Sequence, residues 1–81
     1  MINQQIKNNR RNQIRDIIPH IVQTACAYQS KITFQVDQKR VNAKSIMGVM
    51  ALASQSYDEI CVSVEGEDEE EALHAMAGLL Q

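Results

Sequence analysis

The sequence predicts a single α+β domain in which a four-stranded antiparallel sheet carries three helices on one face. Two observations support this fold class. First, several short segments alternate polar and apolar residues, which indicates half-buried strands. Second, the segments between and after these strands have apolar residues that recur at helical spacing, which indicates helices. Such helices cannot bury an apolar stripe alone, so they must pack on the sheet. The expected order over residues 1–81 is β-α-β-β-α-β-α, an open-faced sandwich.

The first half of the chain predicts a strand followed by a helix. Ile2 and Ile6 share one face of an extended segment, which indicates a polar and weakly specified strand. Asp16 is expected to N-cap the helix. The apolar residues of that helix recur at helical spacing: Ile18, Ile21, Val22, Ala25 and Tyr28. Pro19 is compatible with its first turn, where backbone N–H groups have no intrahelical acceptor.

The middle of the chain predicts a β-hairpin and a short helix. KITFQV (Lys31 to Val36) alternates as a half-buried strand does, and two residues separate it from Lys39 to Asn42. A tight hairpin fits this spacing, although Gln38 stands where a turn favours Gly. The helix is expected to follow Ser45.

The last third predicts a strand and a helix. Glu59 to Glu65 alternates, and its apolar face is Ile60, Val62 and Val64. Asp68 is expected to cap the final helix, with Glu71 completing a capping box. The buried stripe of that helix is expected to be Leu73, Met76, Ala77 and Leu80.

Composition narrows the class of protein. The chain has 81 residues, 44% of them hydrophobic and 22% charged, which is an ordinary globular balance and argues against disorder. Its apolar runs are far shorter than the roughly 18 residues that cross a bilayer, so no membrane insertion is expected. The first residues, MINQQIKNNRR, lack the apolar core of a signal peptide, so we expect a cytoplasmic protein.

The charges are unevenly distributed. Four cations precede the first acid: Lys7, Arg10, Arg11 and Arg15. No aromatic residue interleaves with them, so this basic stretch does not predict nucleic-acid binding. Cys26 and Cys61 have no metal-ligand spacing and are expected to be small buried hydrophobes, so neither a metal nor a cofactor is expected.

The segment VNAKSIMGVMALA (Val41 to Ala53) resembles the regulatory-serine region of HPr, the phosphocarrier family of the bacterial sugar phosphotransferase system. The resemblance runs without a gap from QTACAY to ICVSVEGEDEEEAL, which ends at Leu73. It implies the HPr-like open-faced sandwich, and a carrier or regulator of phosphate rather than an enzyme.

In that family a histidine at the start of the first helix, in the motif H-A-R-P, receives phosphate from enzyme I. The corresponding stretch here is QIRDIIP, in which Ile14 or Arg15 falls at the histidine position, depending on the anchor chosen. The partner arginine of the family is also missing, and Asp16 would repel a phosphate at the helix start.

Two histidines stand elsewhere in the sequence. His20 lies one residue past Pro19, about a turn inside the helix, and is a weak alternative phospho-acceptor. It is better interpreted as a partly buried or surface helix histidine, and His74 as an exposed one.

The second phosphorylated residue of the family is the serine ahead of the short helix, the substrate of HPr kinase/phosphorylase. Ser45 occupies that position. Two compatible interpretations stay open: an N-cap worth about 1 kcal/mol, and a regulatory phosphorylation site beside a docking surface. The expected docking residues are Lys44, Ile46, Met47 and Met50.

The resemblance leaves three hypotheses. The preferred one is a binding module of carbon catabolite regulation controlled at Ser45, similar to the Crh-type branch that lacks the histidine. The others are a phosphocarrier that uses His20, and an interaction domain without phosphorylation. The implied partners are HPr kinase/phosphorylase and a transcriptional regulator or phosphotransferase protein, and a homodimer stays open.

Overall fold

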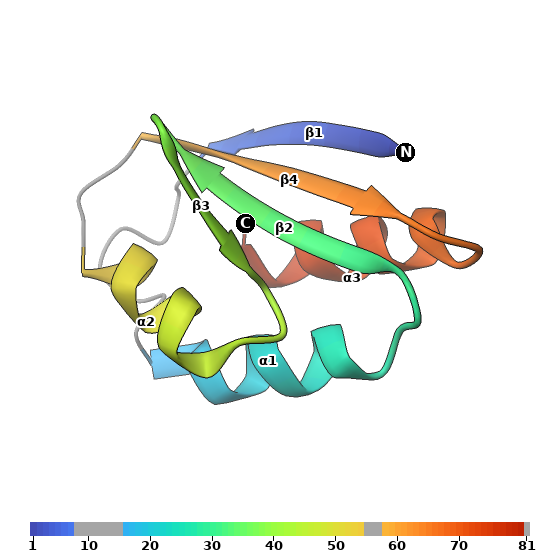
Figure 1. Ribbon diagram of the computed structural model, residues 1–81, viewed down its shortest axis with the longest axis horizontal. Helices are drawn as coiled ribbons and strands as arrows, with labels where there is room; N and C mark the ends of the chain where they lie inside the picture. Colours follow the sequence, from blue (N-terminus) through green and yellow to red (C-terminus); the bar gives the residue numbers. More distant parts are fainter. Residues whose placement is uncertain (8–15, 55–57, 81) are drawn as a thin grey trace.

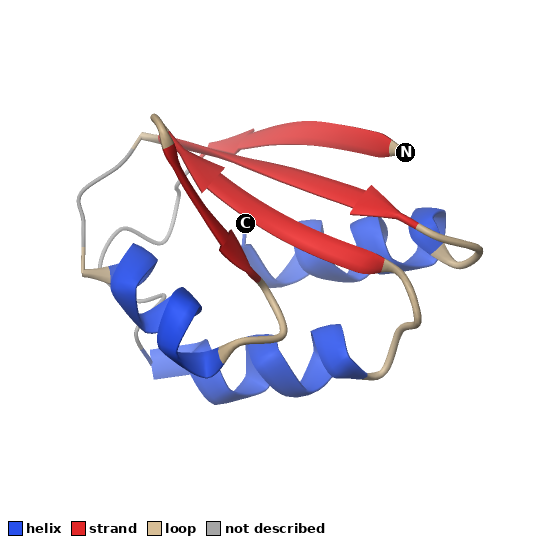
Figure 2. Ribbon diagram, in the orientation of Figure 1, coloured by secondary structure: helices blue, strands red, loops and turns tan. Residues whose placement is uncertain are grey.

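The computed structural model describes residues 1–7, 16–54 and 58–80. Its elements are β1 (Ile2–Lys7), α1 (Ile18–Cys26), β2 (Lys31–Val36), β3 (Lys39–Asn42), α2 (Ile46–Ala53), β4 (Glu59–Glu65) and α3 (Glu69–Leu80). The strands pair antiparallel in the order β1-β4-β2-β3. The described helices all lie on one face of the sheet and leave the other face open (Figures 1 and 2). The predicted open-faced α+β sandwich is confirmed.

The core lies between the sheet and the helices. The central strands supply its middle, because alternate residues of β2 and β4 point to the same face. Phe34 pairs with Val62, and Ile32 pairs with Val64. All four side chains are fully buried. The helices add Ile18, Ile21, Ala25, Val49, Leu52, Ala53, Ala72, Met76 and Leu80.

The hairpin between β2 and β3 has the predicted two-residue turn. Val36 pairs with Lys39, so only Asp37 and Gln38 lie between the strands. Asp37 takes the positive φ of 55° that the turn requires, a conformation that Asp tolerates better than most residues. The Gln35 side-chain amide donates to the Asp37 carbonyl at 3.0 Å. The unusual backbone angle therefore falls on Asp37 and not on Gln38.

The predicted N-cap of α1 is wrong. The helix begins at Ile18, and the N-cap position is Ile17, whose side chain makes no capping hydrogen bond. Asp16 and Ile17 instead form a short 3₁₀ turn. Pro19 stands in the first helical turn, where its fixed φ suits the helix start. Tyr28 lies beyond the end of α1 and is half-buried.

The predicted capping box of α3 is also wrong. The Asp68 carboxylate accepts hydrogen bonds from the backbone N–H groups of Gln29 at 2.9 Å and Ser30 at 3.0 Å, and from the Ser30 hydroxyl. It therefore ties the loop after α1 to the start of α3. The local contact is made by Glu69 instead, whose carboxylate accepts from the Gly66 amide at 3.2 Å.

The turn that precedes α3 needs its glycine. Gly66 has a φ of +154°, and a Cβ there would collide with Ser30, which is fully buried. Within α3 the buried stripe is Ala72, Met76 and Leu80, whereas Leu73 and Ala77 are only half-buried. The predicted stripe is therefore shifted by one residue at its start.

None of the helices in the described part of the chain is long and apolar enough to span a membrane.

Candidate functional site

The candidate site is the start of α2. Ser45 has an extended backbone and is the N-cap residue, and its hydroxyl accepts a hydrogen bond from the Gly48 amide at 3.2 Å. The Ser45 carbonyl accepts the first helical bond, from Val49 at 3.0 Å. The N-cap interpretation is confirmed. The Ser45 side chain is half-buried, so its hydroxyl lies where exposed amides and the positive end of the helix dipole meet solvent.

The first turn of α2 is fixed on the neighbouring strand. A Cβ at Gly48 would lie 3.2 Å from the Val41 Cβ on β3 and 3.5 Å from the Asn42 carbonyl oxygen. The contact with Val41 would be tight, so a larger residue here would require the strand or the helix to shift slightly. The Asn42 carbonyl also accepts from the Ser45 amide at 3.0 Å. Ser45 is therefore held by a hydrogen bond to β3 as well as by its hydrogen bonds to α2.

Lys44 is not a free surface cation. Its ammonium donates to the Tyr28 carbonyl at 2.8 Å, just past the end of α1. A cation is favoured there, because the carbonyl end of a helix carries partial negative charge. The Lys44 carbonyl lies 4.0 Å from the Cys26 thiol, which donates to it. Lys44 joins the loop before α2 to the end of α1, so it helps to position the site. Its predicted part in partner binding stays a prediction.

The outer side of α2 carries an apolar patch made of Ile46, Met47 and Met50. These side chains are 47%, 78% and 55% exposed. The opposite side of the same helix is core, with Val49 and Leu52 fully buried. A helix that is apolar on both sides should be buried on both sides. The patch thus has the exposure expected of a docking surface, and methionines suit several partners because they are flexible and polarisable.

The structure describes only part of the segment that corresponds to the family's histidine motif. Ile14 and Arg15 lie outside the described residues, so their predicted role as the degenerate phosphate site stays a prediction. His20 is exposed and is the third residue of α1, closer to the helix start than predicted. Lys44, the residue before Ser45, contacts the end of α1, whereas His20 lies at its start. His74 is exposed on α3, as predicted.

The cysteines do not behave as predicted. Cys26 is exposed at the end of α1, and Cys61 is half-buried on the open face of the sheet. Alternation along β4 places Cys61 on the face opposite Ile60 and Val62. The alternation of side chains along β4 therefore places Cys61 on the open face, although cysteine is usually found in the core.

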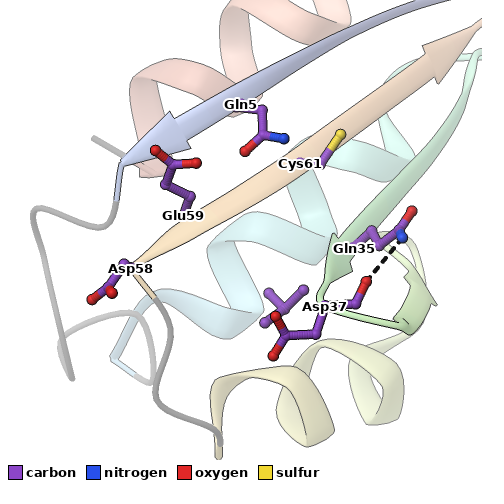
Figure 3. A pocket seen from close by; sticks show the side chains of 7 residues that line it. Gln5, Gln35, Asp37, Asp58, Glu59 and Cys61 are labelled. Carbon is purple, nitrogen blue, oxygen red and sulfur yellow. Dashed lines mark hydrogen bonds between the residues drawn. The ribbon is translucent and has the colours of Figure 1, made fainter.

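Sequence reasoning missed a hollow of about 720 Å³ on the open face of the sheet, lined by Gln5, Gln35, Val36, Asp37, Asp58, Glu59 and Cys61 (Figure 3). Strand register could have revealed part of it, because Cys61 pairs with both Gln5 and Gln35. Within the described ranges, no group of three or more His, Cys, Asp or Glu residues is arranged to hold a metal ion.

Comparisons with known proteins agree with this geometry. A family model described as "PTS HPr component phosphorylation site" matches residues 13–81. The chain is 45% identical over 60 residues to the HPr-like protein Crh of Bacillus subtilis, covering 74% of this chain and 71% of that one. It is 52% identical over 61 residues to the phosphocarrier protein HPr of Treponema pallidum, covering 75% and 69%.

Solved structures of HPr and Crh proteins also superpose on this chain. The HPr-C-His structure from Thermoanaerobacter tengcongensis superposes with a TM-score of 0.85 at 38% identity, covering 99% of this chain and 91% of that one. A Bacillus subtilis Crh structure described as a swapped dimer superposes with a TM-score of 0.72 at 42% identity, covering 79% and 74%.

Proposed function

The chain belongs to the HPr family of the bacterial sugar phosphotransferase system, and on this premise we propose that it is a regulatory binding protein switched by phosphorylation of Ser45. The observation that carries the proposal is the pairing of an N-cap hydroxyl with the exposed apolar patch on the same short helix. The substrate hydroxyl and the docking surface then belong to one rigid element.

Phosphorylation suits this cap physically. A phosphate adds a charge of about −1.5 to −2 and three strong acceptor oxygens. At Ser45 these oxygens face the amides of the first turn of α2, which include the Gly48 amide that the hydroxyl already engages. The helix dipole favours negative charge at this end. The modified helix therefore stays folded, and the change falls on the electrostatic field beside Ile46 and Met47.

In this proposal the role of Lys44 is to hold the loop before α2 in place. Its ammonium is held by the Tyr28 carbonyl, so the loop keeps Ser45 at the helix start in both states. The partners are a serine kinase of the HPr kinase/phosphorylase type and a protein that docks on the apolar patch, a transcriptional regulator or another phosphotransferase protein. A cytoplasmic location follows from these partners.

One observation favours a second candidate, a phosphocarrier that uses His20. That imidazole is exposed in the first turn of α1, where helix amides attract anions. The stretch QIRDIIP argues against it, because it offers no histidine ahead of Pro19 and places an acid at Asp16.

Two parallel reactions test the proposal. The protein is incubated with an HPr-type serine kinase and ATP, and separately with enzyme I and phosphoenolpyruvate, and mass spectrometry then locates the phosphate. We expect one acid-stable phosphate on Ser45, absent from Ser45→Ala and retained by Ser54→Ala, a serine at the other end of the same helix. Acid-labile phosphate on His20 would support the carrier function instead.

Docking is tested separately. Met47→Asp is expected to abolish capture of the partner by the phosphorylated protein while leaving the circular dichroism spectrum unchanged. If neither reaction labels the protein but Met47→Asp still abolishes binding, the chain is an interaction domain without phosphorylation.

A further inference from the structure

Asn42, the last residue of β3, makes two hydrogen bonds to the loop that leads to Ser45. Its side-chain oxygen accepts from the Lys44 amide at 2.9 Å. Its backbone carbonyl accepts from the Ser45 amide at 3.0 Å. The residues from Asn42 to Ser45 therefore form a tight turn, and an Asn at the first position of such a turn bonds the backbone two residues on. One residue thus holds both the amide of the serine and the amide before it.

The sheet fixes the position of Asn42. Its backbone pairs with Thr33 on β2, and the next residue, Ala43, donates its amide to the Ile32 carbonyl at 3.0 Å. Ala43 is fully buried, whereas Asn42 is exposed. The Asn42 side chain therefore contributes little to the core, and the hydrogen bond that it makes serves the loop before α2.

Lys44 links Asn42 to Ser45, and each of its polar groups has a partner. Its ammonium donates to the Tyr28 carbonyl, and its carbonyl accepts from the Cys26 thiol. The Asn42 side chain holds the third group, the Lys44 amide. The backbone that enters Ser45 is therefore fixed, and this fixes the direction in which the Ser45 side chain leaves the loop.

Phosphorylation places a strict demand on the orientation of the serine oxygen. That oxygen forms a bond to the γ-phosphorus of ATP, the bond between this phosphorus and the leaving ADP breaks, and the hydroxyl proton passes to a base of the kinase. The attacking and leaving oxygens must lie roughly in line. A misplacement of about 1 Å in an active site can slow a reaction about 10²-fold. The direction in which the loop presents the Ser45 hydroxyl therefore affects the rate strongly.

We propose that Asn42 is a positioning residue for the phosphorylation of Ser45, and that it acts through the hydrogen bond from its side chain to the Lys44 amide. This inference rests on the proposed function, because it requires Ser45 to be the substrate of a kinase. Asn42 does not touch the reacting atoms. It keeps the loop in the conformation that presents the Ser45 hydroxyl to the kinase.

The turn limits which side chains can replace Asn42. An Asp carboxylate oxygen lies at the same distance from the backbone as the Asn oxygen, so Asp can accept from the Lys44 amide. Gln carries the same amide group one methylene further from the backbone, and Ala has no acceptor. Asp also adds a negative charge near Ser45, which opposes the transfer of an anionic group. We therefore expect Asp to keep part of the rate, and Gln and Ala to lose it.

Steady-state kinetics with an HPr-type serine kinase and ATP test the inference. Asn42→Ala is expected to lower kcat and kcat/KM by the same factor, about 10- to 100-fold. Equal losses in the two quantities indicate an interaction that matters only in the transition state. Asn42→Gln should be as slow as Asn42→Ala, and Asn42→Asp should be clearly faster than both. A rise in KM with an unchanged kcat would overturn the inference, because Asn42 would then contribute to binding and not to positioning.

Gln35→Ala is the matched control. It removes a side-chain hydrogen bond of 3.0 Å to the Asp37 carbonyl, in the same hairpin but at the end of β3 away from Ser45. It is expected to be phosphorylated at the parent's rate, and thermal unfolding should show similar midpoints for Gln35→Ala and Asn42→Ala. Equal rates for the parent and Asn42→Ala would overturn the inference and leave the proposed function standing. A parent protein that takes no phosphate on Ser45 would overturn both.

Discussion

The Ser45 hydroxyl accepts a hydrogen bond from the Gly48 amide, and it is the group that we propose a kinase modifies. These roles do not conflict, because the amides that the hydroxyl caps are also suited to a phosphate. The free energy of the cap can be measured in the unmodified protein, apart from any signalling function.

Ser45→Ala is expected to lower the free energy of unfolding by about 1 kcal/mol, since it removes the acceptor for the Gly48 amide. Ser45→Asp should lose less, because its carboxylate can accept the same bond. Urea unfolding followed by circular dichroism measures both changes. Ser54→Ala is the control: its hydroxyl donates to the Ala51 carbonyl at the other helix end. Equal losses for Ser45→Ala and Ser45→Asp would argue against the cap.

Asp68 gives a pH-dependent prediction. Hydrogen bonds from the Ser30 hydroxyl and the Gln29 amide hold the pKa of Asp68 below its ordinary value of 3.8. A lowered folded-state pKa stabilises the protein fully above the unfolded pKa, and this contribution disappears as pH falls through the folded value. Asp68→Asn should therefore unfold at a lower temperature than the parent at pH 7.

The difference between Asp68→Asn and the parent should shrink once the pH falls below 3.8. Thermal unfolding measured from pH 7 to pH 2 checks this. Ser30→Ala should reduce the same pH dependence, since it removes the strongest donor. A temperature difference that stays constant down to pH 2 would show that the charge of Asp68 is not what stabilises the fold.

At the scale of the element, α2 has one apolar side in the core and another apolar side that is exposed. Leu52 is fully buried, whereas Met47 is 78% exposed. Leu52→Ala is expected to cost about 2–5 kcal/mol by opening a cavity, and Met47→Ala to change stability by less than about 0.5 kcal/mol. Urea midpoints compare the two directly. Similar losses would mean that the apolar patch is part of the core and not a docking surface.

At the scale of the whole molecule, β4 is one of the two central strands of the sheet. It pairs with both β1 and β2, and its Ile60 is 1% exposed. Ile60→Ala is expected to cost about 2–5 kcal/mol, a large share of the 5–15 kcal/mol typical of a small protein. Leu73→Ala should cost clearly less, because Leu73 is half-buried. Denaturant unfolding with an unchanged m-value measures both, and a larger loss for Leu73→Ala would contradict the burial pattern.

The amino-acid sequence by itself determined the strands, the helices and their order, and the apolar face of each strand, whereas the buried stripe of α3 begins one residue earlier than predicted. The alternation in Lys31–Val36 and the spacing from Ile18 to Ala25 each lie within one short segment, where backbone geometry fixes which side chains share a face. The Ser45 cap was predictable for the same reason, because its partner is only three residues away. The family resemblance also rests on the contiguous segment Val41–Ala53.

The tertiary structure decided the partners of the polar side chains and the exposure at element edges. Asp68 has the sequence of a helix cap but binds Ser30, which is 38 residues away, and the Lys44 ammonium binds the Tyr28 carbonyl 16 residues away. No local pattern encodes such contacts, since they exist only once the loop after α1 has packed beside α2 and α3. Cys61 faces outward because its strand neighbours Ile60 and Val62 face the core, and a side chain in a strand cannot choose its face independently of them.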